Sequence, residues 1–297
     1  MTFDLKAYLD ARRTLVDAAL DRVLPSEDLV PINLHRAMRY SVLAPGKRLR
    51  PTLVIAGAEA VGGVAESVLD TACALELIHA YSLIHDDLPA MDDDDYRRGR
   101  LTNHKVFGEA MAILAGDALL TLAFRLIAGN AARLSDPRTV SHVVGDVADA
   151  AGTDGMVGGQ VIDIESEGKE VGPDTLEYIH RHKTAALIRV SLTAGATLAG
   201  GRTEQLAAIG RAGEALGLAF QIVDDILDVE GSLAELGKTA GSDVRKKKAT
   251  YPAYHGLEAS KQKARTLIAE TKHYLEPLGP SAEPIRALAD FVLERRS

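Results

Sequence analysis

The sequence predicts an all-α fold in one domain that spans residues 1–297. The first observation is composition: apolar residues make up 46% of the chain, only 4% of residues are aromatic, and there is no tryptophan. Such a mixture, rich in Ala and Leu, favours helix over strand. The second is periodicity, since apolar residues recur every three or four positions along most of the chain. The third is that neither alternating strand segments nor a Pro/Ser-rich linker interrupts this pattern.

Proline and glycine set the limits of the predicted helices. The periodic run at 5–23 ends before Pro25, and Pro51 stands where a second helix can start. A long apolar segment follows at 67–87. Further helical stretches, divided by Gly, Pro, Asn or Asp clusters, are predicted at roughly 108–130, 137–165, 174–199, 203–231 and 258–295.

Charge and cysteine content narrow the classes of partner. The chain has 34 basic against 42 acidic residues, a net charge of −8, which argues against a nucleic-acid partner. Cys73 is the single cysteine, so an internal disulfide framework and a cysteine-based zinc site are excluded and a cytoplasmic location is expected. No 18-residue stretch is free of charge, and the sequence therefore predicts no membrane span.

The first of two aspartate clusters, DDLPAMDDDDYRRG, closes an apolar helix. Asp86 and Asp87 fall on the last turn of that helix, and Pro89 disfavours helix at the residue before it. We therefore expect the loop to bring Asp92 back toward Asp86, where the two carboxylates can share a hard cation such as Mg²⁺. A solvated acidic loop is the alternative interpretation, above all for the run 93–95.

The second cluster is FQIVDDILD. Asp224 and Asp228 are four residues apart and share a helix face, with Asp225 beside them. The neighbouring residues are apolar, so the face is partly buried and an unneutralised acidic stripe there would be costly. A bound cation would neutralise this acidic stripe and remove that cost. Neither cluster contains the Glu-x-x-His pair of di-iron helical proteins, and oxygen ligands alone favour Mg²⁺, whose shell substrate phosphates usually complete.

Basic residues supply the other half of a site for anions. PGKRLRP holds Lys47, Arg48 and Arg50 between two prolines, and Arg97 and Arg98 follow the first aspartate cluster. Arg grips a diphosphate with two donors and Lys adds a point charge. A basic run is more often a solvated face, so no single group decides the matter. Together with two acidic clusters, they predict one diphosphate held by metal ions and a second held by Arg and Lys.

Five motifs carry a resemblance to a known family. GKRLRP, DDLPAMD followed by RRG, HKT, GLAFQIVDDILD, and GK before D-x-x-x-x-K are together similar to the trans-polyprenyl synthases. DDLPAMDDDD resembles the bacterial farnesyl diphosphate synthases most. The resemblance runs from about residue 30 to the C-terminus. It implies an isoprenoid synthase fold of about ten core helices around a central cavity, three Mg²⁺ ions and a homodimer.

The resemblance also implies a role for individual residues. Asp86 and Asp92 would hold two Mg²⁺ ions on the diphosphate of dimethylallyl or geranyl diphosphate, and Asp224 a third. The same diphosphate would be contacted by Arg97, Lys183 and Lys238. Isopentenyl diphosphate would be bound by Gly46, Lys47, Arg50, His79 and Arg98. Thr184 and Gln221 would face the developing allylic cation, so that the catalytic set is Lys183, Thr184 and Gln221.

Five further positions are implied less directly. Lys248 corresponds to the second lysine after GK, although Lys246 or Lys247 could share its role. Gln160 and Asp163 lie where the family lines its cleft. The terminal Arg295 and Arg296 would close over the isopentenyl diphosphate.

Product length should depend on the residues beneath the first aspartate motif. Tyr81 and Ser82 lie five and four residues before Asp86, about 7.5 Å away for Tyr81 at 1.5 Å per residue. A bulky side chain there floors the pocket in the family. Tyr81 therefore favours farnesyl diphosphate, with an ordinary core aromatic as the alternative interpretation.

Three alternative functions were weighed against this one. A geranylgeranyl diphosphate synthase is the nearest, and it usually has a smaller residue where Tyr81 stands. A terpene cyclase would be expected to lack GKRLRP and the second aspartate motif. A non-catalytic partner subunit would be expected to have lost one of the two aspartate motifs. Both motifs and GKRLRP are present.

Overall fold

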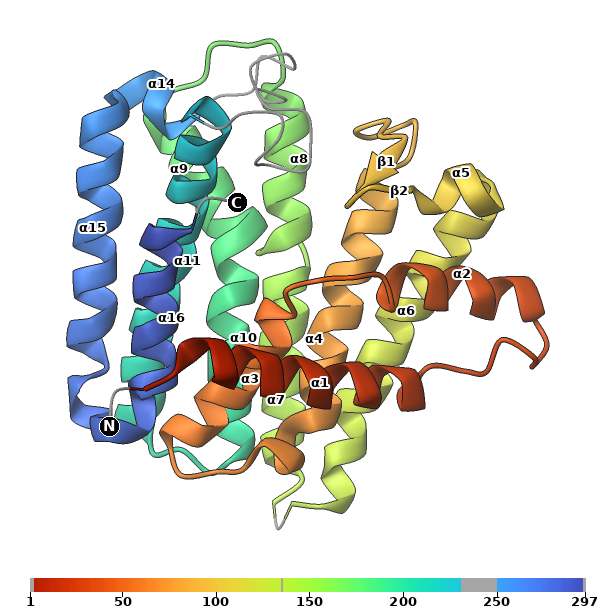
Figure 1. The fold of residues 1–297 in the computed structure, drawn as a ribbon, viewed down its shortest axis with the longest axis horizontal. Coiled ribbons are helices and arrows are strands. Elements are labelled where there is room, and N and C mark those ends of the chain that lie inside the picture. The colour runs from red at the N-terminus through yellow and green to blue at the C-terminus, as the bar shows by residue number, and fades with distance from the viewer. Residues whose placement is uncertain (1–2, 135, 231–249, 296–297) are drawn as a thin grey trace.

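The computed structural model describes residues 3–134, 136–230 and 250–295. It is all-α in this part of the chain, apart from one short hairpin, so the predicted fold class is confirmed (Figure 1). The helices are α1 (Leu5–Val23), α2 (Ile32–Val42), α3 (Leu49–Ala60), α4 (Ala65–Asp86), α5 (Asn103–Phe107), α6 (Glu109–Gly129), α7 (Arg138–Ala151), α8 (Met156–Ser166), α9 (Pro173–Ile179), α10 (Ala186–Leu198), α11 (Thr203–Glu230), α14 (Tyr251–His255), α15 (Leu257–Tyr274) and α16 (Glu283–Glu294). The hairpin pairs β1 (Tyr96–Arg97) with β2 (Arg100–Leu101).

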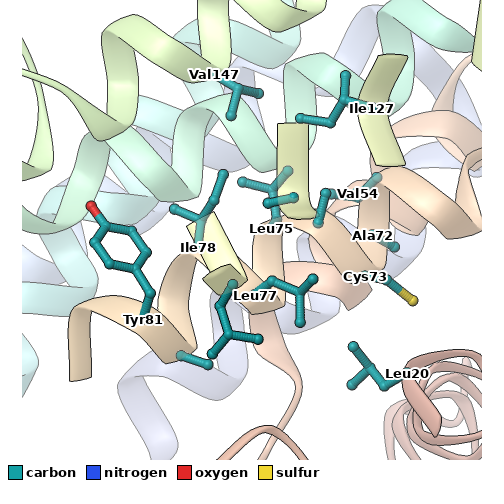
Figure 2. Close-up of a cluster of buried hydrophobic side chains, with 14 of the residues drawn as sticks. Leu20, Val54, Ala72, Cys73, Leu75, Leu77, Ile78, Tyr81, Ile127 and Val147 are labelled. Atoms are coloured by element: carbon teal, nitrogen blue, oxygen red, sulfur yellow. The ribbon is translucent and has the colours of Figure 1, made fainter. Parts of the chain in front are cut away.

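Two hydrophobic clusters form the core. One joins α4 to α6, α7 and the N-terminal helices, and Figure 2 shows its side chains around Leu75 and Ile78. The other joins α11 to α15 and α16. Helices α3 and α10 connect them at close range, because a Cβ on Gly57 would lie 2.1 Å from the carbonyl oxygen of Leu192 and one on Gly195 would lie 1.8 Å from that of Val54. Only glycine permits this contact between two helix backbones.

Two of the predicted helices are divided in the structure, and a third changes its helix type. The stretch predicted at 137–165 breaks between α7 and α8, where Gly152 has an extended backbone and Gly155 is not helical. The stretch at 258–295 breaks at the 3₁₀ segment Glu276–Ala282, where Gly279 has a φ of 63°. The stretch at 174–199 is continuous but contains the π-helical segment η2 (His180–Ala185). Period alone did not reveal these breaks, since the apolar pattern resumes in register after each of them.

The sequence prediction that no segment could span a membrane is not confirmed. By length and composition alone, α4, α6 and α11 are each apolar enough to cross a bilayer. Most of that apolar surface in α4 and α11 is buried inside the protein, whereas only 33% of the most apolar window of α6 is buried.

Candidate active site

A cavity of about 1170 Å³ opens among α1, α3, α4, α11 and α16. Its wall brings together eight residues that the sequence analysis assigned to substrate or metal: Gly46, Lys47, Arg50, His79, Arg98, Thr184, Gln221 and Asp224. They come from positions up to 178 residues apart, from Gly46 to Asp224. Their individual roles stay predictions, but their convergence on one cavity is a property of the fold.

The loop before α3 is held in shape by a buried arginine. Arg48 is only 5% exposed and has a φ of 49°, a left-handed conformation that costs energy for a residue other than glycine. Its guanidinium donates to Glu76 at 2.8 Å, to Asp17 at 2.7 Å and to the carbonyl oxygen of Ala44 at 3.0 Å. Arg48, which the sequence grouped with the anion-binding cations, is therefore a structural anchor. Lys47 beside it is left to line the cavity.

Positive charge is concentrated on one part of this wall, with the carboxylates of Glu76 and Asp224 acting against it. Burial lowers the pKa of Arg50 from its ordinary value, and the neighbouring Arg98 acts in the same direction. Burial, with Arg50 and Arg98 nearby, also lowers the pKa of His79 well below its usual range. Arg98 donates to the carbonyl oxygen of Pro45 at 3.0 Å. A polyanion such as a diphosphate would relieve this repulsion.

The first aspartate motif begins where α4 ends, as the sequence predicted. The backbone N–H of Asp92 donates to the carbonyl oxygen of Asp86 at 2.8 Å, so the loop does return to the helix end. Burial raises the pKa of Asp86 to about 6, with Asp92 acting in the same direction and Lys183 opposing. Arg97 bonds Asp87 at 2.6 Å and thus supports the motif from behind. It is not among the residues that line the large cavity.

The rest of this loop fits the alternative interpretation. Asp93 and Asp95 are exposed, and Asp95 forms an ion pair with Lys105 at 2.7 Å on the surface.

Lys183 and Thr184 lie in η2, the π-helical part of the α9–α10 rod. Such π segments occur often at functional sites. Lys183 donates to Asp163 of α8 at 2.6 Å, so Asp163 contacts a predicted site residue, although it is not among the residues that line the large cavity. A Cβ on Gly159 would lie 2.3 Å from the backbone nitrogen of Lys183, so the GGQVID segment carrying Gln160 packs directly against η2.

The three carboxylates of the second aspartate motif have different surroundings. Asp224 lines the cavity and pairs with Arg295 at 2.8 Å. Arg295 also stacks over the ring of Phe220 at 3.9 Å and lines the cavity, and its closure over isopentenyl diphosphate stays a prediction. Asp225 is 4% exposed and points into the protein, where two donors bond it and His180 Nε2 lies 3.3 Å away. Asp228 is 3% exposed, and among the described residues neither of its oxygens has a hydrogen-bond partner.

Glu-x-x-His pairs do occur outside the two aspartate motifs, as Glu76/His79 and Glu177/His180. This spacing is typical of di-iron helical proteins. Both glutamates are committed elsewhere, Glu76 to Arg48 at 2.8 Å and Glu177 to Arg181 at 2.7 Å. The pairs are therefore parts of ion-pair networks.

The aspartates fit Mg²⁺ better than a metal held by protein alone. Within residues 3–134, 136–230 and 250–295, no group of three His, Cys, Asp or Glu side chains converges closely enough to hold a metal ion. Mg²⁺ is usually bound by one or two carboxylates, with waters and substrate phosphates completing six ligands. The pair Asp86 and Asp92 and the separate Asp224 match that pattern. The unpartnered oxygens of Asp228 lie one turn from Asp224 and add negative potential there.

Some predicted residues cannot be placed. Lys238, Lys246, Lys247, Lys248 and Arg296 lie outside the described residues. Conversely, the cavity wall includes Leu5, Leu9 and Arg13 of α1, which the sequence analysis did not assign. They belong to an ordinary amphipathic helix, and no local motif distinguishes them from core residues.

Comparison with known proteins agrees with this geometry. The family model described as polyprenyl synthetase matches residues 32–276. The chain is 48% identical to the heterodimeric geranylgeranyl pyrophosphate synthase large subunit 1, chloroplastic, of Arabidopsis thaliana, with 100% of this chain and 81% of that protein covered. It is also 48% identical to a dimethylallyltranstransferase of Fischerella ambigua, covering 99% and 84% of the two chains. Geranylgeranyl synthase names recur among further relatives at 45% to 48% identity.

A solved structure shows the same fold. The FPP/GFPP synthase of Zymomonas mobilis superposes with a TM-score of 0.88 at 35% identity, over 97% of this chain and 98% of that one. The helical cavity, the second aspartate motif on its wall and a family match over most of the chain lead to one conclusion: this chain belongs to the polyprenyl synthetase family.

Proposed function

We propose that this chain joins isopentenyl diphosphate head to tail to dimethylallyl or longer allylic diphosphates, with Mg²⁺ as its cofactor. Family membership supports prenyl chain elongation in general. The single observation that carries the more specific proposal is the cavity wall itself. Lys47, Arg50 and Arg98 gather on one part of it, and Asp224 lies on the same wall with the Thr184–Gln221 pair.

The two diphosphates have different partners in this proposal. Isopentenyl diphosphate binds the cationic group formed by Gly46, Lys47, Arg50, His79 and Arg98, which desolvation makes receptive to an anion. The allylic diphosphate lies toward Asp86, Asp92 and Asp224, with Lys183 beside them and Arg97 behind. Mg²⁺ bound there would neutralise charge on the departing diphosphate.

The side chains then act on the reacting carbons. The Thr184 hydroxyl donates to Gln221 Oε1 at 2.8 Å, so both residues present oxygen lone pairs to the cavity. These oxygens stabilise the allylic cation that forms as the C–O bond breaks. The apolar wall around them, including Ile188 and Leu216, excludes water that would otherwise quench the cation. The double bond of isopentenyl diphosphate attacks, and a proton then leaves for the departing diphosphate.

Product length has two candidates. Geranylgeranyl diphosphate, with twenty carbons, is favoured by the names of the relatives at 45% to 48% identity. Farnesyl diphosphate, with fifteen, is favoured by Tyr81, which is 7% exposed and packs its ring edge-on against His85 just before Asp86. We rank the twenty-carbon product first, because identity over the whole chain integrates many positions and Tyr81 is only one.

Incubation with dimethylallyl and isopentenyl diphosphates, followed by mass spectrometry, tests both the proposed condensation and the proposed product length. We expect a product of twenty or fifteen carbons in the presence of Mg²⁺ and none after chelation, with activity restored when Mg²⁺ is returned. Absence of any condensation product would overturn the function, whereas a product of other length would overturn only the two candidates. A cytoplasmic location is proposed as well, since the single Cys73 is a buried free thiol.

A further inference from the structure

The buried carboxylate of Asp225 does not line the cavity, but it contacts Gln221, which does. It accepts from Gln221 Nε2 at 3.0 Å and from the backbone N–H of Tyr251 at 2.8 Å. His180 Nε2 lies 3.3 Å from the oxygen that Tyr251 also uses. Asp225 is 4% exposed and His180 3%. The carboxylate is thus fully committed to protein donors and is turned away from the metal side of the motif.

The amide of Gln221 has two chemically opposite ends, and its surroundings decide which end faces where. An ionised carboxylate only accepts hydrogen bonds, so the NH₂ group of Gln221 must face Asp225. The amide oxygen then points the other way and accepts from the Thr184 hydroxyl at 2.8 Å. This commits the hydrogen of Thr184 to Gln221, so that the hydroxyl oxygen keeps its lone pairs for the cavity. Asp225 therefore fixes the amide, and the amide fixes the hydroxyl.

The orientation matters because of the sign of charge that the reaction develops. A breaking allylic C–O bond leaves positive charge on carbon, which amide and hydroxyl oxygens stabilise and an NH₂ group repels. If the Gln221 amide were reversed, its NH₂ would face Thr184, and the same two residues would present hydrogens where oxygens are needed. The shape and size of the Gln221 side chain would be unchanged, so packing alone does not select between the two orientations of its amide.

The framework around Asp225 is rigid. Helix α11 touches η2 so closely that a Cβ on Gly217 would lie 2.6 Å from Cα of Ala185. Glycine at this position allows Gln221, one turn further along α11, to reach Thr184. The backbone N–H of Tyr251, at the start of α14, holds one carboxylate oxygen and leaves the other for Gln221. The Tyr251 N–H can only donate, so it fixes the Asp225 carboxylate, and the carboxylate fixes the orientation of the Gln221 amide.

We propose that Asp225 is a positioning residue that sets the orientation of the Gln221 amide, and through it the Thr184 hydroxyl, so that only oxygen faces the allylic carbon. The inference rests on the proposed prenyl transfer. It assigns adjacent aspartates to separate tasks, Asp224 to the diphosphate side of the cavity and Asp225 to the carbon side.

The substitution Asp225→Asn makes the test sharp. The backbone N–H of Tyr251 still requires an acceptor, so the Asn oxygen faces it and the Asn NH₂ faces residue 221. That NH₂ drives the Gln221 amide to reverse. We expect the single-turnover rate of condensation, measured by rapid chemical quench with Mg²⁺ at saturation, to fall about 10- to 100-fold. KM for both diphosphates and the Mg²⁺ concentration at half-maximal rate should stay within about two-fold, whereas Asp224→Asn should raise the Mg²⁺ requirement.

A second substitution, at Gln221, distinguishes a reversed amide from a general loss of structure at the site. In the double variant Asp225→Asn, Gln221→Glu, the new Glu carboxylate accepts from the Asn NH₂ on one side and from Thr184 on the other, so oxygen faces the cavity again. We expect its single-turnover rate to exceed that of Asp225→Asn by at least about ten-fold, a coupling that independent defects would not show. Gln221→Glu alone places two carboxylates together and should be slow.

Two results would overturn the inference. One is a single-turnover rate for Asp225→Asn within about two-fold of the unchanged protein, and the other is a double variant no faster than Asp225→Asn. If Asp225→Asn does not fold, the double variant decides the question by itself, since it should fold and be active. Failure of prenyl transfer in the unchanged protein would instead overturn the proposed function, and this separates the two cases.

Discussion

At the scale of single residues, the candidate site contains ionisable side chains whose charged forms burial disfavours. Asp86 shows this most clearly, because burial raises its pKa to about 6 and the facing Asp92 adds repulsion. Lys47 shows the same for cations, since burial lowers its pKa and Arg295 and Arg98 act in the same direction. In the proposed function, substrate and metal ions would relieve both strains, so that part of the free energy of folding is held back for binding.

The residue Asp86 therefore links stability to pH in the metal-free protein. Its pKa in the folded state, about 6, is above the ordinary value of 3.8. The folded state binds this proton more tightly than the unfolded chain does, so the contribution to stability is present below pH 3.8 and is lost as the pH rises through about 6. At neutral pH a charged Asp86 destabilises the metal-free fold.

Asp86→Asn should consequently have opposite effects on stability and activity. We expect a higher melting temperature than that of the unchanged metal-free protein at pH 7.5, measured by calorimetry, and no such gain at about pH 4. Turnover should fall by orders of magnitude, because a ligand on the diphosphate side is lost. Asp93→Asn, in the exposed part of the same loop, is the matched control and should alter neither quantity. A lower melting temperature for Asp86→Asn at pH 7.5 would contradict the account.

At the scale of elements, α4 performs most of the positioning. Over its last three turns it carries Glu76, which holds the loop before α3, then His79 on the cavity wall, then Tyr81, and finally Asp86. Its other face packs on α6, where a Cβ on Gly116 would lie 2.1 Å from the ring of His85. Figure 2 shows Tyr81 at the end of this packed cluster, with its hydroxyl directed away from the other labelled side chains. The helix is thus both core and site, and a change in its core alters the site.

Tyr81→Ala tests whether α4 sets product length. If the ring floors the chamber for the growing tail, its removal should lengthen the main product by at least one five-carbon unit, as read by mass spectrometry. Loss of a large aromatic from a packed core costs about 3–5 kcal/mol, and at a pocket floor the cost should be smaller, because substrate or water fills the space. Ser82→Ala, next to it, removes only a hydroxyl that donates to the carbonyl of His79 and should leave the product unchanged. An unchanged product from a stable Tyr81→Ala variant would mean that another element limits the chain.

At the scale of the whole molecule, one of the exposed apolar surfaces lies on α6. Helix α6 exposes Ile113 and Leu114 at 45% and 53%, and Val106 of α5 beside it is 43% exposed. Contiguous apolar surface of this kind is typical of an interaction face. We propose that a second copy of the chain covers α6, which matches the homodimer implied by the sequence resemblance.

A charge placed on this face should separate the copies. We expect Leu114→Glu to shift the mass measured by size-exclusion chromatography with light scattering from dimer to monomer, because burying an unpaired carboxylate is costly. Leu29→Glu, at an equally exposed leucine of the loop before α2, is the control and should keep the mass of the unchanged protein. A monomeric unchanged protein, or a dimeric Leu114→Glu variant, would rule out this interface.

Sequence alone determined the features that depend on near neighbours. The spacing of apolar residues marked α1, α4, α6 and α11 almost to their ends, because helical contacts join residues three and four apart. Pro89 after Asp86 placed the helix end, and the returning loop followed from it. The two aspartate motifs and the basic segments identified the class of chemistry, since ligand type depends on side-chain composition rather than on packing.

Only the tertiary structure decided which of these residues face one another. Arg48 and Lys47 are adjacent in sequence and both border the cavity, yet the guanidinium of Arg48 is buried and paired with Glu76 at 2.8 Å. Asp224 and Asp225 are likewise adjacent, and their side chains leave α11 about 100° apart, so that one pairs with Arg295 and the other with Gln221. Glu76 lies 28 residues from Arg48 and Arg295 lies 71 residues from Asp224, so no local pattern encodes these two pairs. Gln221 and Asp225 are four residues apart on one helix face, but Tyr251 and His180, which also contact Asp225, come from other elements. Packing fixes these contacts because a buried charge requires partners.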